Sequence, residues 1–386
     1  MKHVLFIAGW CDPFGDFIKE HAYAIAKYNK VSYVFVDFIK SNKHLPYKIT
    51  TEQKRLHNVD MYFVTVHAPV RRFGIFERLN KKAYQQIITK INAQNAIDIC
   101  HINVRTNITE LLLELPLLSQ VPMVLTEHNT YYHYGVYKKY SGEDLTREMN
   151  RVKAWLNYPQ IKYILPVSNE LASVLEKDWQ IPAARIKVIP NVAAPEFTYK
   201  AKNTSAKLQI ALLAIWKAPK NPMLFAKALT DLPPSSRSQL TINWMGAGEL
   251  LDEARMYLQD QAPEIEINYT GIVYDRQRVA AAMQAADVFV HPTDAENLPC
   301  VIIESLCCGT PVISHAVNGV PELVNATNGW LAPKGTTAAI TKALQELIDN
   351  RHKFQSTEIA QTAGQRYSHE AIGTAYTHIY SQLIEP

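Results

Sequence analysis

Short runs of apolar residues alternate along the chain with longer segments in which apolar residues recur every three or four positions. The first apolar run, residues 4–8, predicts a buried strand, and the spacing within residues 17–28 predicts a helix with one apolar face. Strands at 31–36 and 61–66 and a helix at 76–91 continue the alternation. This order is typical of an α/β domain with a parallel sheet.

A pause in this pattern divides the chain. Residues 191–207 are polar and lack a clear period, so we expect a linker at 193–206. The predicted elements on either side are strands at 97–102, 123–126, 161–167, 208–215, 239–245, 265–269, 288–291 and 312–314, and helices at 169–177, 223–229, 249–259, 276–285 and 299–308. We therefore predict two doubly wound α/β domains facing each other across a cleft, with ligands bound at the carboxyl ends of the strands.

Length and composition agree with two ordinary globular domains. The chain has 386 residues, of which 47% are hydrophobic and 20% are charged, which is enough to build two cores. No stretch of about 18 uncharged apolar residues predicts a membrane span, and the N-terminus does not resemble a signal peptide. The five cysteines form no C-x-x-C pair, so we expect free thiols and a cytoplasmic location.

The stretch ENLPCVIIE, residues 296–304, places two carboxylates around an apolar run. Pro299 suits the first turn of a helix and Gly309 suits its end. Glu296 would then lie just before the helix and Glu304 about one turn past its start, so both can face the helix N-terminus. That end favours phosphate and the carboxylates favour hydroxyl groups, a combination that describes a nucleotide sugar. The alternative is a solvated Glu296 and a Glu304 paired with a lysine.

This region resembles the signature of the retaining glycosyltransferases of family 4, which have the GT-B fold (glycosyl transferases group 1). The segment HPTDAENLPCVIIESLCCGTPVISHAVNGVPELV, residues 291–324, matches the E-x7-E motif of that family at Glu296 and Glu304. Other segments follow in the family's order along almost the whole chain: PFGDFIKEHAYAIA at 13–26, LTEHNT at 125–130, PVSNEL at 166–171, KVIPNV at 187–192, KNP at 220–222, MGAGEL at 245–250 and YTGIV at 269–273.

The resemblance implies a division of labour between the domains. The last helix, predicted at 369–383, would cross back to the first domain. The acceptor-binding domain would then comprise residues 1–192 and 366–386, and the donor-binding domain would comprise residues 207–365.

The resemblance also implies a role for each matching residue. Glu304 would bind the ribose, Glu296 the donor sugar, and Lys220 the departing diphosphate, because a fixed cation stabilises the charge that develops there. His128 would position the donor sugar or the acceptor, although a lone histidine is more often structural. The expected catalytic residues are Glu296, His128 and Lys220, and the expected donor-binding residues are Gly15, Lys217, Lys220, Gly246, Val273, Glu296, Asn297, Leu298, Cys300 and Glu304.

One position departs from the family pattern. An arginine usually lies five residues before the lysine, and here that residue is Ile215. Lys217 could substitute for the charge, but an ammonium cannot form a bidentate fork. The chain contains no D-x-D motif, which holds a divalent ion in glycosyltransferases of another fold. We expect an enzyme that is metal-independent, has no cofactor and uses a UDP- or GDP-linked donor.

The acceptor is expected to be a glycan or a lipid-linked sugar of a cell-surface polysaccharide. Residues 1–200 carry a net positive charge and the rest a net negative charge. Residues 70–91 combine aromatic side chains with a basic set that would suit an anionic inner membrane surface: Arg71, Arg72, Arg78, Lys81 and Lys82. The alternative is a helix packed on the sheet. No nucleic-acid-binding module is recognisable. The tyrosine-rich tract 130–140 could line the acceptor site or form a packed loop.

Two other functions are compatible with parts of the sequence. Ile215 in place of the arginine would suit a nucleotide-sugar-binding protein without turnover. The segment MGAGEL resembles part of a dinucleotide-binding fingerprint at Gly246 and Gly248, but its third glycine position is Leu251. Binding of NADH would support an NAD(P)-dependent oxidoreductase.

Overall fold

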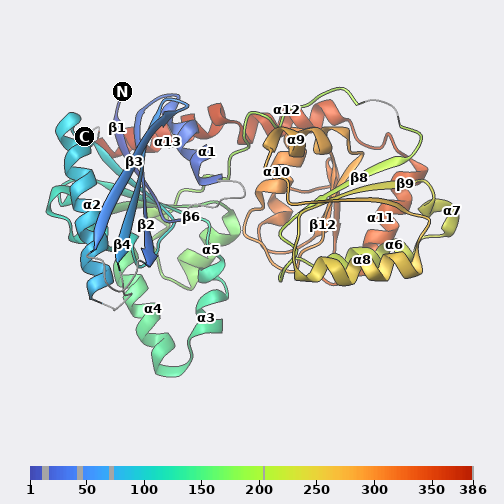
Figure 1. The fold of residues 1–386 in the computed structure, drawn as a ribbon, viewed down its shortest axis with the longest axis horizontal. Helices are drawn as coiled ribbons and strands as arrows, with labels where there is room; N and C mark the ends of the chain where they lie inside the picture. The colour runs from blue at the N-terminus through green and yellow to red at the C-terminus, as the bar shows by residue number, and fades with distance from the viewer. Residues whose placement is uncertain (11–16, 41–46, 69–73, 203–204, 385–386) are drawn as a thin grey trace. The chain divides into compact units, whose positions relative to one another are not determined.

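The computed structural model describes residues 1–10, 17–40, 47–68, 74–202 and 205–384, and these form two compact units (Figure 1). Unit 1 comprises Met1–Pro190 and His369–Pro386, and unit 2 comprises Asn191–Ser368. Each unit has its own mainly parallel sheet flanked by helices, so the prediction of two α/β domains is confirmed. Among the described helices, none is both long enough and apolar enough to cross a membrane.

Unit 1 contains a seven-stranded sheet in the order β3-β4-β2-β1-β5-β6-β7. Its strands are β1 (His3–Ala8), β2 (Lys30–Lys40), β3 (Lys48–Leu56), β4 (Val59–Ala68), β5 (Ile99–Asn103), β6 (Met123–Glu127) and β7 (Ile161–Pro166). All of them except β3 run parallel. The carboxyl ends of the parallel strands therefore lie at one edge of the sheet, where residues from distant parts of the chain meet.

The sequence pattern does not predict β3. Its residues, KITTEQKRL, are mostly exposed and lack apolar alternation, because this strand forms the antiparallel outer edge of the sheet. His57 and Asn58 connect β3 to β4 with φ angles of 47° and 63°, as a tight two-residue hairpin turn requires. A polar edge strand also protects a sheet from pairing with other chains.

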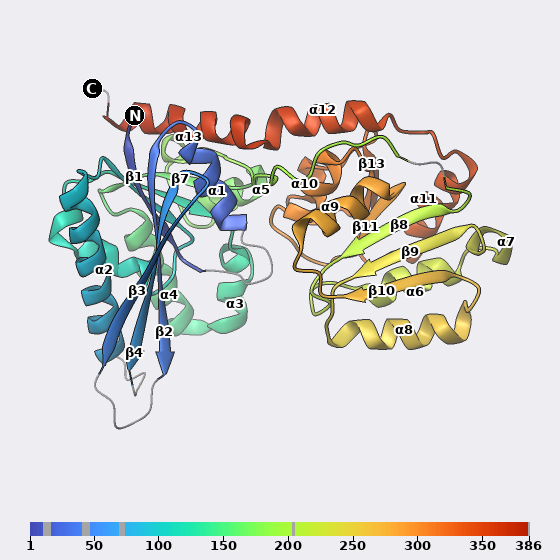
Figure 2. The same ribbon diagram turned by 45° about the horizontal axis from the view of Figure 1, so that its top comes forward.

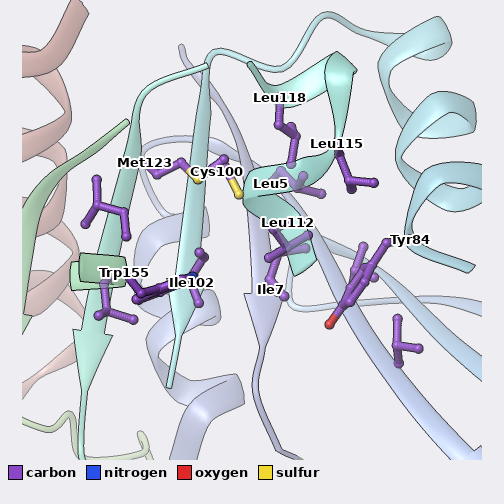
Figure 3. Close-up of a cluster of buried hydrophobic side chains, with 14 of the residues drawn as sticks. Leu5, Ile7, Tyr84, Cys100, Ile102, Leu112, Leu115, Leu118, Met123 and Trp155 are labelled. Carbon is purple, nitrogen blue, oxygen red and sulfur yellow. The ribbon is translucent and has the colours of Figure 1, made fainter. Parts of the chain in front are cut away.

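Alternate residues of each unit 1 strand point to opposite faces of the sheet. On one face, Leu5 of β1 packs with Cys100 of β5 and Tyr84 in a buried apolar cluster (Figure 3). The helices that contribute to this cluster are α2 (Ile75–Gln94), α3 (Gly135–Lys139), α4 (Gly142–Leu156) and α5 (Asn169–Lys177). Phe6, which points to the other face, contacts His101 instead. The pattern predicts α2 and α5 but not α4, whose sequence is mostly polar.

Unit 2 contains a six-stranded, entirely parallel sheet in the order β10-β9-β8-β11-β12-β13. Its strands are β8 (Leu208–Leu213), β9 (Leu240–Met245), β10 (Glu266–Gly271), β11 (Val288–His291), β12 (Val312–His315) and β13 (Gly329–Ala332). Its helices are α6 (Pro222–Thr230), α7 (Pro234–Arg237), α8 (Glu249–Gln261), α9 (Arg276–Ala285), α10 (Cys300–Cys307), α11 (Thr337–Asp349) and α12 (Ser356–Tyr367). Helices α6 and α8 lie on one face of the sheet, and α9 and α10 lie on the other (Figure 2). The pattern does not predict α7, α11, α12 or β13.

The described part of the segment expected as a linker packs within unit 2. The backbone N–H of Ala193 donates to the carbonyl of Tyr367 at 2.8 Å, and Phe197 is buried. The side-chain amide of Gln284 donates to two carbonyl groups of this segment. Residues 193–202 form neither helix nor strand, yet their backbone forms hydrogen bonds with other residues of unit 2.

The last helix, α13 (His369–Ile384), packs on α1 (Phe17–Ala26) in unit 1. The expected return of this helix to the first domain is therefore confirmed. Gly373 permits close packing, because a Cβ there would lie 2.2 Å from the carbonyl oxygen of Ala24.

Two tyrosines of α13 complete a chain of buried hydrogen bonds in unit 1. Tyr380 Oη lies 2.6 Å from Nδ1 of His101, whose Nε2 lies 2.7 Å from Oγ1 of Thr126. Tyr376 Oη lies 3.3 Å from the same threonine hydroxyl and 2.9 Å from Nδ1 of His21. Burial lowers the pKa of His101 well below its usual value, so its ring is neutral and uses one nitrogen as donor and one as acceptor.

We predict that Tyr380→Phe lowers the free energy of unfolding by about 1–3 kcal/mol, because it removes the partner of a buried nitrogen of His101. Tyr137→Phe is the matched control, because Tyr137 is also in unit 1 but is 46% exposed; its effect should stay below about 0.5 kcal/mol. Urea unfolding measures both changes. Equal stabilities of the two variants would contradict a stabilising role for the Tyr380 hydroxyl.

Candidate functional site

Two loops at the carboxyl edge of the unit 2 sheet are joined to each other. One loop follows β8 and the other follows β11. Backbone hydrogen bonds connect them on both sides of Lys220, which itself forms an antiparallel β-bridge with Thr293. This pairing brings Lys220 to Glu296, although the two residues are 76 positions apart in the sequence.

Lys220, Glu296 and His291 form one cluster. Lys220 Nζ donates to Oε1 of Glu296, and Nε2 of His291 lies 2.6 Å from the same oxygen. The side chains of Lys220 and Glu296 are only 20% and 14% exposed. Burial lowers the pKa of Lys220 to about 8, and the carboxylate beside it opposes this change by favouring the charged amine. Two of the three expected catalytic residues are thus in direct contact.

His291 is a member of this cluster that the sequence reasoning missed. Burial, and secondarily the charge of Lys220, lower the pKa of His291 well below its usual value. A neutral imidazole can donate from Nε2 to the Glu296 carboxylate and so fix its orientation. The sequence did contain a signal for His291: it is a polar residue at the end of a buried strand, five positions before Glu296.

The helix α10 begins next to this cluster. Pro299 is its N-cap residue, and among the described residues no side chain caps the first turn. The first N–H groups of a helix lack partners within the helix and carry the positive end of its dipole. Two backbone carbonyl groups of the loop before α10 accept hydrogen bonds from other segments. Gly319 N donates to Asn297 O at 3.1 Å, and Asn191 Nδ2 donates to Leu298 O at 2.6 Å. Cys300 is the first helical residue.

Glu304 lies in the second turn of α10 and is paired with an arginine. Arg276 Nη2 donates to Oε1 of Glu304 at 3.1 Å, and the Glu304 side chain is 9% exposed. A buried carboxylate needs such a partner, because an unpaired charge away from water is costly. The sequence reasoning considered a lysine partner for Glu304 but did not single out Arg276, the first residue of α9, 28 positions away.

Gly246 has a structural reason to be glycine. Its φ is 103°, and a Cβ there would lie 1.9 Å from the carbonyl oxygen of Ala214 in the loop after β8. Trp216 fixes that loop, because its Nε1 donates to Met245 O at 2.9 Å and its backbone N–H donates to Ala247 O at 3.0 Å. The glycine therefore allows two loops at the carboxyl edge to touch.

The remaining donor-side positions surround these loops. Ile215 is 44% exposed, so an apolar side chain occupies the place of the family's arginine at the surface of the loop. Lys217 is exposed and Val273 is half-buried between β10 and α9. Gly15 lies outside the described residues, as do Arg71 and Arg72 of the basic set.

His128 belongs to unit 1, where it directly follows β6. It is 8% exposed, and its ring lies 4.9 Å from that of Phe17 and 5.1 Å from that of His21, measured between centroids. Because His21 is held by Tyr376 of α13, the orientation of His128 depends on that helix. His128 therefore lies at the carboxyl edge of the unit 1 sheet, where a ligand of a parallel sheet is expected.

Glu127, the neighbour of His128, is at the centre of a buried polar group. Its Oε1 accepts hydrogen bonds from the backbone N–H of Arg105 and from the hydroxyl of Tyr132, both at 2.9 Å. Arg105 also pairs with Glu110. Burial raises the pKa of Glu127 to about 7, although Arg105 acts to lower it. Val104 adopts a φ of 70°, which is strained for a β-branched residue and turns the chain at this edge.

Among the described residues, no group of three or more His, Cys, Asp or Glu side chains could hold a metal ion. The candidate site of unit 2 brings together a lysine, two carboxylates, an arginine and a helix N-terminus. Such a set can hold an anion together with hydroxyl groups.

Two family models match the chain in sequence order. Residues 41–197 match the model described as Glycosyltransferase Family 4, and residues 209–350 match the model described as Glycosyl transferases group 1. The first match lies mostly in unit 1 and the second lies within unit 2.

Curated relatives match shorter stretches. The 2-deoxystreptamine N-acetyl-D-glucosaminyltransferase of Streptomyces fradiae is 31% identical over 113 residues, which cover 28% of this chain and 27% of the relative. The amylovoran biosynthesis glycosyltransferase AmsK of Erwinia amylovora is 26% identical over 225 residues, 54% of each chain. The chain thus spans between about a quarter and about a half of the length of these relatives.

A solved structure matches over nearly the full length. The structure of HepE from Anabaena in complex with UDP aligns with 99% of this chain and 100% of that chain, with a TM-score of 0.73 and 15% sequence identity. This likeness shows that the two proteins share the GT-B fold.

We predict that Glu127 makes stability depend on pH. Its pKa is about 7 in the folded chain against an ordinary value of 4.5, so between these values the folded state holds a proton that the unfolded state has lost. This contribution to stability is present at low pH and is lost as pH rises from about 4.5 to about 7. Relative to wild type, Glu127→Gln should gain about 3 kcal/mol of stability across that interval.

Denaturant unfolding at a series of pH values measures this difference. Glu143→Gln is the matched control, because it makes the same exchange at an exposed position of the same unit. A constant difference between wild type and Glu127→Gln from pH 4.5 to 7.5 would contradict the raised pKa.

Proposed function

Because the chain belongs to glycosyltransferase family 4 (glycosyl transferases group 1), we propose that it transfers a sugar from a nucleotide-sugar donor to a glycan or lipid-linked acceptor in polysaccharide biosynthesis. The similarity to the amylovoran biosynthesis enzyme supports a role in polysaccharide biosynthesis. The UDP bound to HepE supports a nucleotide-sugar donor. The observation that carries the proposal is the contact between Lys220 and Glu296 beside the start of α10.

The donor is proposed to be UDP- or GDP-linked and to bind at the N-terminus of α10. Its diphosphate would accept hydrogen bonds from the first N–H groups of the helix and face Lys220. Oε2 of Glu296 would accept a hydrogen bond from a hydroxyl group of the donor sugar, because Lys220 and His291 both contact Oε1. Glu304, in the second turn of the helix, would accept hydrogen bonds from the ribose hydroxyl groups.

The proposed chemistry is transfer with retention of configuration and without a metal ion. The bond between the anomeric carbon and the diphosphate oxygen breaks, and negative charge develops on the diphosphate. Lys220 and the helix dipole stabilise that charge, as a divalent ion does in other enzymes. The acceptor hydroxyl attacks on the same face of the sugar, and its proton passes to the leaving diphosphate. His128 in unit 1 would position the sugar or the acceptor.

Unit 1, the expected acceptor-binding domain, is proposed to dock at the inner membrane leaflet through the basic surface of α2. The apolar face of this helix, including Leu79 and Ile87, is buried in the core of unit 1, so the helix packs on the sheet. Among the described residues, membrane contact would therefore rest on Arg78, Lys81 and Lys82, of which Lys81 also pairs with Glu114. Arg71 and Arg72 belong to the same proposed basic set. Each basic residue near an anionic surface contributes about 1 kcal/mol.

We predict that UDP or GDP stabilises the chain against heat in the presence of EDTA. At about 100 times its dissociation constant, the ligand should add about 2.7 kcal/mol to the free energy of unfolding. UDP, GDP, ADP, CDP and NADH, each with EDTA or magnesium, would be compared by thermal unfolding, with Glu304→Ala as the variant that weakens binding. Stabilisation by NADH alone would contradict the proposal, and stabilisation only with magnesium would contradict metal independence.

We further predict that Lys220→Met lowers turnover by about 100-fold or more, because it removes a cation that acts on the developing charge. Lys227→Met is the matched control, because Lys227 is exposed on α6 and should keep full activity. Release of the nucleoside diphosphate from the donor measures turnover. Donor binding in the wild-type chain without release on any acceptor tested would favour the non-catalytic alternative that Ile215 suggests.

We predict that vesicles containing anionic lipid carry the protein upward in a flotation gradient and that neutral vesicles do not. Replacing Arg78, Lys81 and Lys82 together by glutamine should abolish flotation, because the charges would be lost while the buried face of α2 is retained. Replacing Lys138 and Lys139, which are exposed elsewhere in unit 1, is the control. Equal flotation of the two variants would contradict docking through α2.

A further inference from the structure

The loop that carries Glu296 is held from two neighbouring strands. The strand β11 lies between β8 and β12 in the sheet, and the loop after β8 holds the Glu296 side chain through Lys220. The segment after β12 holds the backbone instead. The N–H of Glu296 donates to Oδ1 of Asn318 at 3.2 Å, and the N–H of Gly319 donates to the carbonyl of Asn297 at 3.1 Å. The backbone of the loop is therefore fixed independently of the ion pair.

Asn318 has a backbone conformation that few residue types adopt readily. Its φ is 43°, and it lies in a turn that is closed by a hydrogen bond of 3.0 Å from the N–H of Val320 to the carbonyl of Val317. Glycine, asparagine and aspartate adopt a positive φ most readily, and of these only asparagine and aspartate supply a side-chain oxygen. The turn and the acceptor for the Glu296 N–H thus depend on the same residue.

We propose that Asn318 is a positioning residue of the donor site, which fixes Glu296 so that its Oε2 meets a hydroxyl group of the donor sugar. The inference rests on the proposed function, in which Glu296 binds that sugar. Lys220 and His291 both contact Oε1, and an oxygen held at one point still allows the rest of the side chain to pivot when the backbone moves. The hydrogen bond to Asn318 provides a second fixed point, so the position of Oε2 is determined.

Three variants separate the side-chain oxygen from the turn. Asn318→Gly keeps the positive φ without steric cost but removes the acceptor. It should lower kcat/KM for the donor by about tenfold or more, because a small misplacement of a group that orients the substrate is costly. Asn318→Asp keeps both the φ and the acceptor and should recover most of kcat/KM. Asn58→Gly is the matched control, because Asn58 also has a positive φ, 63°, in an exposed turn of unit 1.

Three measurements test the hydrogen bond, the positioning and the rest of the site. Hydrogen exchange of the Glu296 amide, in the chain without ligand, should be faster in Asn318→Gly than in wild type and in Asn318→Asp. Release of the nucleoside diphosphate from UDP-glucose, UDP-N-acetylglucosamine and GDP-mannose gives kcat/KM. Isothermal titration gives the affinities for UDP and GDP, which should change by less than about twofold in Asn318→Gly, because these ligands lack the sugar that Glu296 would meet.

Each measurement has a result that would overturn the inference. Equal exchange rates in wild type and Asn318→Gly would show that this hydrogen bond does not hold the Glu296 backbone. Unchanged kcat/KM in Asn318→Gly, or an equal loss in Asn318→Asp, would show that the side-chain oxygen does not act on the donor. A parallel loss of affinity for UDP or GDP in Asn318→Gly would indicate a disturbed site rather than a misplaced carboxylate. A wild-type chain that neither binds nor turns over these nucleotides would refute the proposed function, and the exchange rates would then still report the hydrogen bond separately.

Discussion

The contact between Lys220 and Glu296 is the interaction on which the candidate site of unit 2 depends. Either charge alone, mostly removed from water, would cost several kcal/mol. Together they hold the loop after β8 against the loop after β11, and His291 adds a second hydrogen bond to the carboxylate. The segment that carries Glu296 continues directly into α10, so the same contact sets where that helix begins. An anion at the helix end would therefore meet a cation that is already in place.

The strongly patterned parts of the fold could be predicted from the sequence. The helix Asn169–Lys177 and the strand Val288–His291 have the predicted bounds. Leu171 and Leu175 are buried at helical spacing in the helix, and every residue of the strand is buried. The pattern failed where polar residues dominate a segment. The edge strand β3 is exposed and polar, and α4 is mostly polar with few buried positions. Their structure is determined by neighbouring elements rather than by their own periodicity.

The candidate site could be predicted only as far as residues close in sequence define it. Glu296 and Glu304 stand out because two carboxylates flank an apolar run and a helix start. Their partners Lys220 and Arg276 lie 76 and 28 positions away, and chain spacing does not show which cation will reach which carboxylate. A resemblance to a family supplied Lys220. Arg276 could not be found in that way, since it lies outside the motifs that carry the resemblance.

The buried polar groups of unit 1 show why a late segment of the sequence matters for an early one. Tyr376 of α13 contacts His21 and Thr126, and His21 lies beside His128. A satisfied network of buried polar groups has few equivalent arrangements, because any other arrangement leaves a group without a partner. Docking of α13 therefore does more than add apolar contacts. It also brings the Tyr376 hydroxyl to His21 and Thr126 and the Tyr380 hydroxyl to His101, so a helix from the end of the chain supplies the hydrogen-bond partners of buried groups near its beginning.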